Sequence, residues 1–145
     1  MRTADVRAPR LAGGVATCVV AETSGTDNRL LLWTLEEAGA ELVLDDGSEV
    51  TGAFVRMSDA VRAIGALRDV LPADARIGVS AGETSRVGEF VAVAGQASRL
   101  VLTARRGTTV LSKLAANLAI DLLPRDHRLR VDESAYELVT LAPVS

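Results

Sequence analysis

The hydrophobic and polar positions of the 145-residue chain follow two periods, and each change of period marks a predicted element. Short apolar runs rich in β-branched residues, such as 15–21 (VATCVVA), predict buried strands. Apolar residues spaced three and four apart predict helices, as in 58–71, where Ala60, Ile64 and Leu67 share one face. The predicted strands are 15–21, 41–45, 49–55, 76–81, 87–93, 108–111 and 136–141, and the predicted helices are 28–38, 58–71, 95–106 and 112–122.

Turn-forming residues separate these elements and set their order. The stretch 45–48 (Asp-Asp-Gly-Ser) predicts a tight turn that joins 41–45 to 49–55 as a hairpin. The resulting order, β-α-β-β-α-β-β-α-β-α-β, mixes strand pairs with helices. It predicts an α+β fold with a mostly antiparallel sheet and helices packed on one or both faces. Residues 1–12, with three arginines and a proline, are predicted to form a flexible N-terminal tail before a single domain, 13–145.

Composition excludes several classes of function. Aromatic residues make up 3% of the chain and the net charge is −3, so direct nucleic-acid binding is not expected. Cys18 and His127 are the only residues of their kinds, which excludes an intrachain disulfide and a zinc site of the usual kind. We expect Cys18 to be buried and inert, and His127 to lie exposed in a polar loop. No apolar stretch approaches ~20 residues, so we expect no membrane span and a cytoplasmic location.

Several segments, taken in order, resemble the class III nucleotidyl cyclase family. Residues 75–100, ARIGVSAGETSRVGEFVAVAGQASRL, resemble its strand RIGIHTGE, its hairpin and its helix beginning VNxAARL. GAELVLDDG followed by FVRMSDAVRAIGAL is similar to GGxVVKTxGDG followed by FxxxxDAVRAALAL, and GTTVLSKLAANLA is similar to PGxVLVSxxTAxLA. The resemblance covers about residues 15–143. It implies a ferredoxin-like βαββαβ core with a trimmed N-terminal helical region, one helix standing where the family usually has two.

The resemblance also implies where the family's active-site groups fall. The two metal-binding aspartates fall on Ala21 and Asp46, the purine-reading lysine and acid on Leu42 and near Gly88, and the transition-state asparagine and arginine on Gly95 and Arg99. Asp46 and Arg99 alone keep the family's chemistry. A single carboxylate does not hold two magnesium ions, which the family's phosphoryl chemistry requires. We therefore expect no self-contained cyclase activity, no metal site and no cofactor.

The leading functional hypothesis is a catalytically inactive cyclase-homology domain that acts as a dimerisation and regulatory module in bacterial signalling. Its partner would be a second copy or a signalling protein. A second hypothesis is a pseudoenzyme sensor in which Arg99 and Gly95, at the start of a helix, hold a nucleotide or another phosphate-bearing ligand. A third is a half-site, contributing Asp46 and Arg99, that a partner cyclase subunit completes.

Structural roles also account for both retained residues. Asp46 suits an Asp-Gly turn, and Arg99 is placed to pair with Glu83 or Glu89. A further alternative is that the resemblance is accidental and the chain is another small α+β sandwich.

Overall fold

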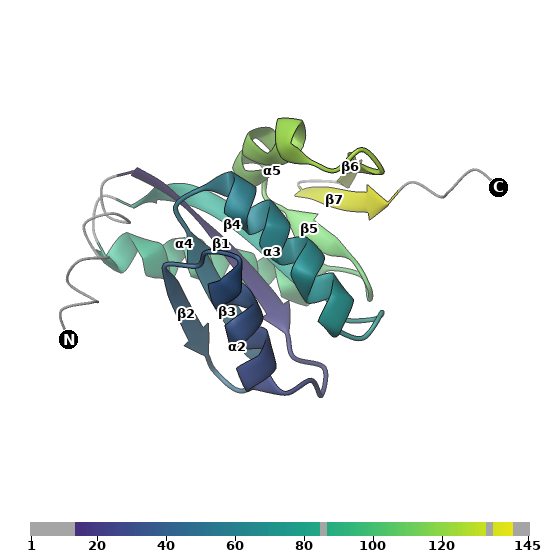
Figure 1. The fold of residues 1–145 in the computed structure, drawn as a ribbon. Coiled ribbons are helices and arrows are strands. Elements are labelled where there is room, and N and C mark those ends of the chain that lie inside the picture. The colour runs from purple at the N-terminus through teal and green to yellow at the C-terminus, as the bar shows by residue number, and fades with distance from the viewer. Residues whose placement is uncertain (1–13, 85–86, 133–134, 141–145) are drawn as a thin grey trace.

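The computed structural model describes residues 14–84, 87–132 and 135–140, which form one twisted sheet with helices on both faces (Figure 1). The predicted tail, 1–12, lies outside the described residues. The strands are β1 (Gly14–Glu22), β2 (Leu42–Asp45), β3 (Glu49–Phe54), β4 (Ile77–Thr84), β5 (Thr109–Leu111), β6 (His127–Asp132) and β7 (Ala135–Thr140). The helices are α2 (Asn28–Glu37), α3 (Met57–Val70), α4 (Val87–Thr103), α5 (Lys113–Ala119) and the short 3-10 helix η1 (Ile120–Leu122).

The sheet has seven strands in the order β2-β3-β1-β4-β5-β7-β6. Every neighbouring pair is antiparallel except β4 and β5, which are parallel. The elements from β1 to β4 follow the order βαββαβ, and their strands lie side by side as β2-β3-β1-β4. This arrangement confirms the predicted α+β class and the ferredoxin-like core. One helix, α2, connects β1 to β2, also as predicted.

Each face of the sheet has its own hydrophobic core. Alternate residues of β1 point to opposite sides, so Val19 and Ala21 join one core and Cys18 and Val20 join the other. Helices α2, α3 and α5 cover the first face, and α4 covers the second (Figure 1). Both cores are built mainly from alanine, valine, leucine and isoleucine, as the scarcity of aromatic residues requires.

Helix α4 packs directly onto strand β4 at a glycine. A Cβ atom built on Gly78 would lie 2.2 Å from the backbone oxygen of Ala97 and 3.0 Å from the side chain of Val101. No real side chain fits at that separation, because the neighbouring atom is backbone and has no rotamer to change. The absence of a side chain at Gly78 therefore sets how closely α4 approaches the sheet.

The predicted strand 87–93 is wrong, because these residues form the first half of α4. Phe90, Val93, Ala97 and Val101 are all buried against the sheet, and their spacing of three or four residues is that of a helix. The valines in this run favour a strand locally, but a continuous helix covers the second face of the sheet and buries them. The hairpin that the resemblance implies before this helix is also absent, since β4 ends at Thr84 and α4 begins at Val87.

The segment predicted to be a polar loop around His127 is instead the edge strand β6, which pairs with β7. Arginines alternate with apolar residues in this strand, and one of the apolar residues, Val131, is 66% exposed. Edge strands commonly carry charged side chains on the face that the core does not need. The apolar run on which strand prediction depends is therefore missing here.

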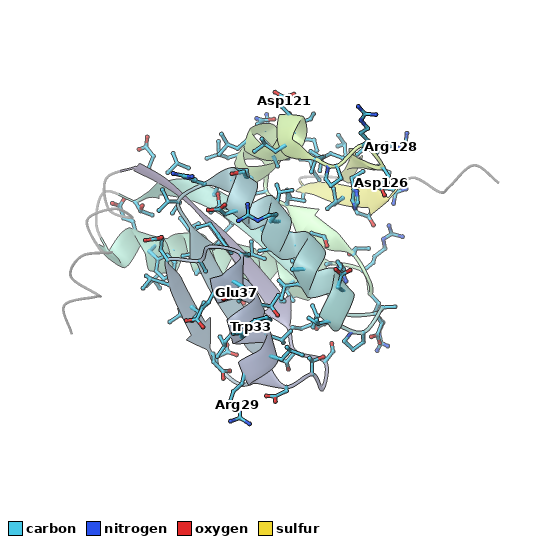
Figure 2. The ribbon with its side chains drawn as sticks, in the orientation of Figure 1. Arg29, Trp33, Glu37, Asp121, Asp126 and Arg128 are labelled. Carbon is cyan, nitrogen blue, oxygen red and sulfur yellow. The ribbon has the colours of Figure 1, made fainter. Side chains whose placement is uncertain are left out.

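The outer surface of α2 faces away from the sheet. Arg29, Trp33 and Glu37 project outward from this helix, whereas Leu31 and Leu35 pack inward (Figure 2).

No helix among the described ranges combines the length and the apolar character that a membrane span needs.

Strand β7 holds a buried carboxylate between two cations. Glu137 is buried, and its carboxylate accepts hydrogen bonds from Arg130 Nη2 at 2.7 Å and from Arg105 Nη2 at 2.8 Å. Hydrogen bonds from Arg130, and then from Arg105, lower the pKa of Glu137 from its ordinary value. This group therefore ties the β6–β7 hairpin to the end of α4.

We predict opposite effects for two glycine substitutions in this structure. Gly78→Ala should lower the free energy of unfolding by about 1–3 kcal/mol, because the new methyl group overlaps the backbone of α4. The control is Gly65→Ala in α3, where an added Cβ meets nothing within 4 Å. That change should raise stability by up to about 1 kcal/mol through helix propensity. Urea denaturation measures both, and equal effects of the two changes would contradict the packing argument.

We predict that Glu137→Gln weakens the acid sensitivity of the fold. A carboxylate whose folded pKa is lowered adds stability above its unfolded pKa, about 4.3 for glutamate, and loses it as the pH falls through the folded value. The variant should be less stable than wild type near neutral pH, and the difference should shrink in acid. Thermal unfolding across this pH range measures it, with the exposed Glu37→Gln as the control that should follow wild type.

Candidate functional site

Asp46 lies at the surface, in the turn between β2 and β3. Its Oδ1 accepts hydrogen bonds from the backbone N–H of Glu49 at 2.8 Å and from Ser48 Oγ at 3.4 Å. The neighbouring Asp45 Oδ1 accepts one from the N–H of Gly47 at 2.9 Å, and Gly47 has a positive φ of 96°. Both carboxylates thus stabilise the turn itself, which is the structural role considered for Asp46 above.

Gly95 and Arg99 lie well inside α4, at its ninth and thirteenth positions, not at its start as predicted. The backbone N–H groups around them are used within the helix, so the predicted position of these two residues at a helix N-terminus is wrong. Arg99 is exposed, and its Nη1 would lie 3.8 Å from a Cβ atom built on Gly95. Within the ranges that the structure describes, no ion pair with Glu83, Glu89 or any other carboxylate engages Arg99.

Arg99 belongs to a continuous exposed stripe on α4. Val91, Gly95 and Leu102 share this side of the helix because they are spaced by three or four residues or multiples of them. Val91 is 65% exposed and Leu102 is 68% exposed. The side of α4 that faces away from the sheet therefore combines two large apolar side chains with one exposed guanidinium.

The structure brings the two retained residues toward the same end of the molecule. Ser98, next to Arg99, donates a hydrogen bond of 2.7 Å to Glu49 Oε1, and Glu49 begins β3 three residues after Asp46. Sequence reasoning did not identify this link, because the two residues are 49 positions apart and no local pattern joins them.

The position of the family's first metal aspartate, Ala21, is a fully buried methyl group. Its neighbour Glu22 carries a carboxylate, but that group is held by Arg76. Glu22 Oε1 accepts from the backbone N–H of Arg76 at 2.9 Å and Oε2 accepts from Nη2 at 2.9 Å. Hydrogen bonding from the Arg76 side chain is the main cause that lowers the pKa of Glu22. Pairing the predicted strands β1 and β4 would have placed Glu22 beside Arg76, because Ala21, the residue before Glu22, lies opposite Ile77, the residue after Arg76.

The residues present do not fit the pair of magnesium ions that the resemblance implies. Ala21 has no ligand atom, Glu22 is engaged by Arg76, and Asp46 is engaged in its own turn. Across the described ranges, no group of three or more His, Cys, Asp or Glu side chains is arranged to hold a metal ion.

Cys18 is completely buried in the core beneath α4, as predicted. Burial raises the pKa of its thiol to about 12. The reactive thiolate is therefore scarce near neutral pH, and Cys18 has the properties of a core residue.

Of the comparisons with known proteins, only the comparison with solved structures finds proteins that are similar to this chain. No protein-family model matches the sequence, and no curated protein has a significantly similar sequence. The structure is similar to the guanylyl cyclase domain of a rhodopsin fusion protein from the fungus Blastocladiella emersonii, with a TM-score of 0.59 and 16% identity over 88% of this chain and 95% of that one. That fungal domain has been crystallised both as a monomer and as a dimer.

Two further solved structures of cyclases are similar to this chain over most of their length. An adenylate/guanylate cyclase/hydrolase from Silicibacter pomeroyi has a TM-score of 0.58 and 17% identity over 88% of this chain and 98% of that one. The guanylate cyclase domain of Catenaria anguillulae, solved in complex with GTP, has a TM-score of 0.58 and 15% identity over 89% and 98% of the two chains. The chain therefore has the fold of the class III adenylate and guanylate cyclase domains.

Proposed function

We propose that this chain is a catalytically inactive cyclase-fold domain that acts through protein–protein contact, as a dimerisation and regulatory module. The observation that carries this proposal is a preserved fold whose catalytic positions have lost their chemistry. Ala21, Leu42 and Gly95 hold no metal-binding, base-reading or transition-state group. The partner is a second copy of the chain or a protein of a signalling system.

The absence of each of these groups is expected to lower the rate of catalysis. Phosphoryl chemistry with two metal ions needs carboxylates that neutralise the developing charge, and one of the two positions is the buried methyl of Ala21. Removing a single donor that stabilises a transition-state oxyanion typically costs a factor of about 10²–10³ in rate. Gly95 lacks such a donor, so the losses compound.

The exposed stripe of α4 is the surface through which we propose that the chain self-associates. Fully burying a side chain such as that of Val91 or Leu102 is worth about 1.5–3 kcal/mol relative to leaving it exposed. A twofold dimer uses the same patch on both subunits, so its interface buries two copies of each of these side chains. The dimeric crystal form of the fungal cyclase domain is consistent with association through this fold.

We predict that the domain self-associates and that charge on the α4 stripe prevents it. The double variant Val91→Glu/Leu102→Glu should be monomeric, because association would bury four carboxylates, and the two Arg99 side chains of a dimer can pair with only some of them. The control is Val131→Glu, which adds charge at an equally exposed position on the edge strand β6 and should leave the dimer intact. Light scattering coupled to gel filtration measures the mass, and a wild-type chain that is monomeric at every concentration would oppose the homodimer.

We predict no cyclic nucleotide formation from ATP or GTP with magnesium or manganese. An authentic cyclase assayed in parallel serves as the positive control, with mass spectrometry as the detector. Product that appears with the wild type and disappears in Asp46→Ala and Arg99→Ala would overturn the assignment as an inactive domain.

A sensor that binds a nucleotide is the second candidate, and the exposed guanidinium of Arg99 over Gly95 is the observation that favours it. The Catenaria anguillulae domain was solved with GTP bound. Calorimetric titration with ATP, GTP and cyclic nucleotides should then show saturable binding that Arg99→Ala removes. Silence across these nucleotides would leave protein–protein contact as the function.

A further inference from the structure

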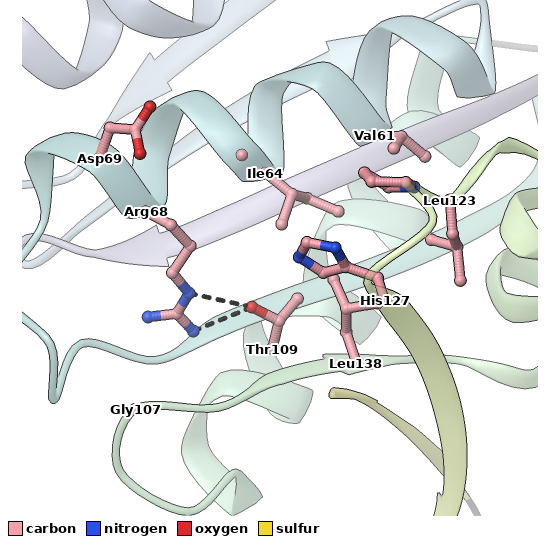
Figure 3. A pocket seen from close by; sticks show the side chains of 11 residues that line it. Val61, Ile64, Arg68, Asp69, Gly107, Thr109, Leu123, His127 and Leu138 are labelled. Carbon is pink, nitrogen blue, oxygen red and sulfur yellow. Dashed lines mark hydrogen bonds between the residues drawn. The ribbon is translucent and has the colours of Figure 1, made fainter. Parts of the chain in front are cut away.

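A cavity on the α3 side of the sheet lies apart from the positions where the family's active-site groups fall. It has a volume of about 350 Å³ and is enclosed by α3, β5 and the segment that leads from η1 into β6 (Figure 3). None of Asp46, Gly95 or Arg99 lines it, and α4 covers the opposite face of the sheet. Its volume is within the ~300–1,000 Å³ range of pockets that hold small molecules.

Arg68 supplies a half-buried positive charge to this cavity. Its Nε and Nη2 donate to Thr109 Oγ1 at 3.2 and 2.9 Å (Figure 3). Its Nη1 donates to the backbone oxygen of Ala75 at 2.6 Å. All of these acceptors are neutral. Burial lowers the pKa of Arg68 from its ordinary value, but a guanidinium stays charged in proteins.

Among the described residues, Arg68 differs from the other arginines that are held in place because it forms no ion pair. The charge of Glu22, which Arg76 binds directly, acts on Arg68 only at longer range. Arg62, Arg76 and Arg105 each lie within 2.9 Å of a carboxylate oxygen. Within the described part of the chain, no carboxylate forms an ion pair with Arg68. A buried charge without a partner is costly, so an anion entering the cavity would gain more here than at a solvated arginine.

The guanidinium is fixed in position and still has hydrogen-bonding capacity. Of its five N–H groups, three are used by Thr109 and Ala75, which leaves two for a ligand. A carboxylate binds arginine through two parallel N–H···O bonds, so the available capacity matches one carboxylate.

The remaining walls determine what carries that carboxylate. Figure 3 shows Arg68 and His127 on opposite sides of Thr109. The apolar surface between them is supplied by Val61, Ile64 and Leu138. His127 is 25% exposed, and its Nδ1 lies 2.7 Å from Asp126 Oδ1. That contact orients the ring, and in the neutral tautomer that donates Nδ1–H to Asp126, Nε2 is an acceptor for a donor on the ligand.

A second negative charge on the ligand is disfavoured by Asp69. This exposed carboxylate follows Arg68 on α3 and also lines the cavity. Arg68 is the one lysine or arginine among the described lining residues, so a second anionic group on the ligand would lie in the cavity beside Asp69 without a cationic partner. The geometry points to a small monocarboxylate with an apolar body and a hydroxyl or N–H group at its far end as the ligand of this cavity.

Gly65 provides a way to test the site without altering its charges. It lies in the middle of α3, lines the cavity, and a Cβ atom there meets nothing within 4 Å. A glycine inside a helix costs about 1 kcal/mol relative to alanine. A leucine at this position has room for its Cβ atom, and the rest of its side chain would extend over the cavity.

The experiment uses the full chain, without a histidine tag, and titrates 4-hydroxybenzoate, benzoate and inorganic phosphate by calorimetry. His127 is the only histidine, so its imidazole NMR signals report directly on the cavity. We expect saturable 4-hydroxybenzoate binding that shifts these signals, weaker benzoate binding and the weakest binding for phosphate. Equal affinities for 4-hydroxybenzoate and benzoate would contradict the His127 contact, and phosphate as the tightest ligand would contradict the monocarboxylate assignment.

The variants separate the site from the fold. Arg68→Met and Gly65→Leu should each weaken 4-hydroxybenzoate at least about tenfold, which is about 1.4 kcal/mol. Arg62→Met on the same helix is the control and should bind as wild type. If Arg68→Met does not fold, Gly65→Leu decides alone. No saturable binding of either carboxylate, or undiminished binding by Gly65→Leu, overturns the proposal, and neither result bears on self-association through α4.

Discussion

The contact between Gly78 and the backbone of α4 is the constraint on which the two-sided architecture depends. A helix can lie this close to a strand only where the strand has no side chain, and a larger residue would overlap the backbone of α4 at Ala97. With α4 in place, Cys18 and Val20 are buried and the second face of the sheet is closed. The same contact fixes which residues of α4 face outward, and so places Arg99 at the surface.

Charge has different roles on the two faces. Arginine–glutamate pairs join segments distant in sequence, as Arg76 does with Glu22 and Arg105 with Glu137. These pairs occupy the side chains of Glu22 and Glu137, so neither carboxylate is available to a metal. Arg68 is the contrasting case, since neutral oxygens hold it and its charge remains available to the adjoining cavity. The chain thus keeps the cyclase fold while its ion pairs stabilise the structure.

The sequence was a good guide to the first half of the fold and to the turn at Asp46. The helical spacing in α3 and the Asp-Gly turn are local signals, and both elements form as predicted. The assignment of Arg99 to the start of a helix failed because a valine-rich run was interpreted as a strand. The strand β6 was missed because its exposed face carries arginines, so no continuous apolar run marked it. The residues that hold Glu22 and that surround Arg68 come from distant segments, and no local pattern joins them.

The sequence by itself determined which chemical groups are available. Alanine at position 21 and glycine at position 95 exclude a ligand or a donor there in any fold, because those side chains carry no such atoms. The periodicity of the apolar residues also determined the α+β class. A helix and a strand that each bury one face repeat their apolar residues at different spacings, and these spacings can be found in the local sequence. Only the tertiary structure decided that 87–93 is helical and that a cavity lies between Arg68 and His127. Both outcomes depend on packing between segments far apart in sequence, where the gain in buried surface outweighs local propensity.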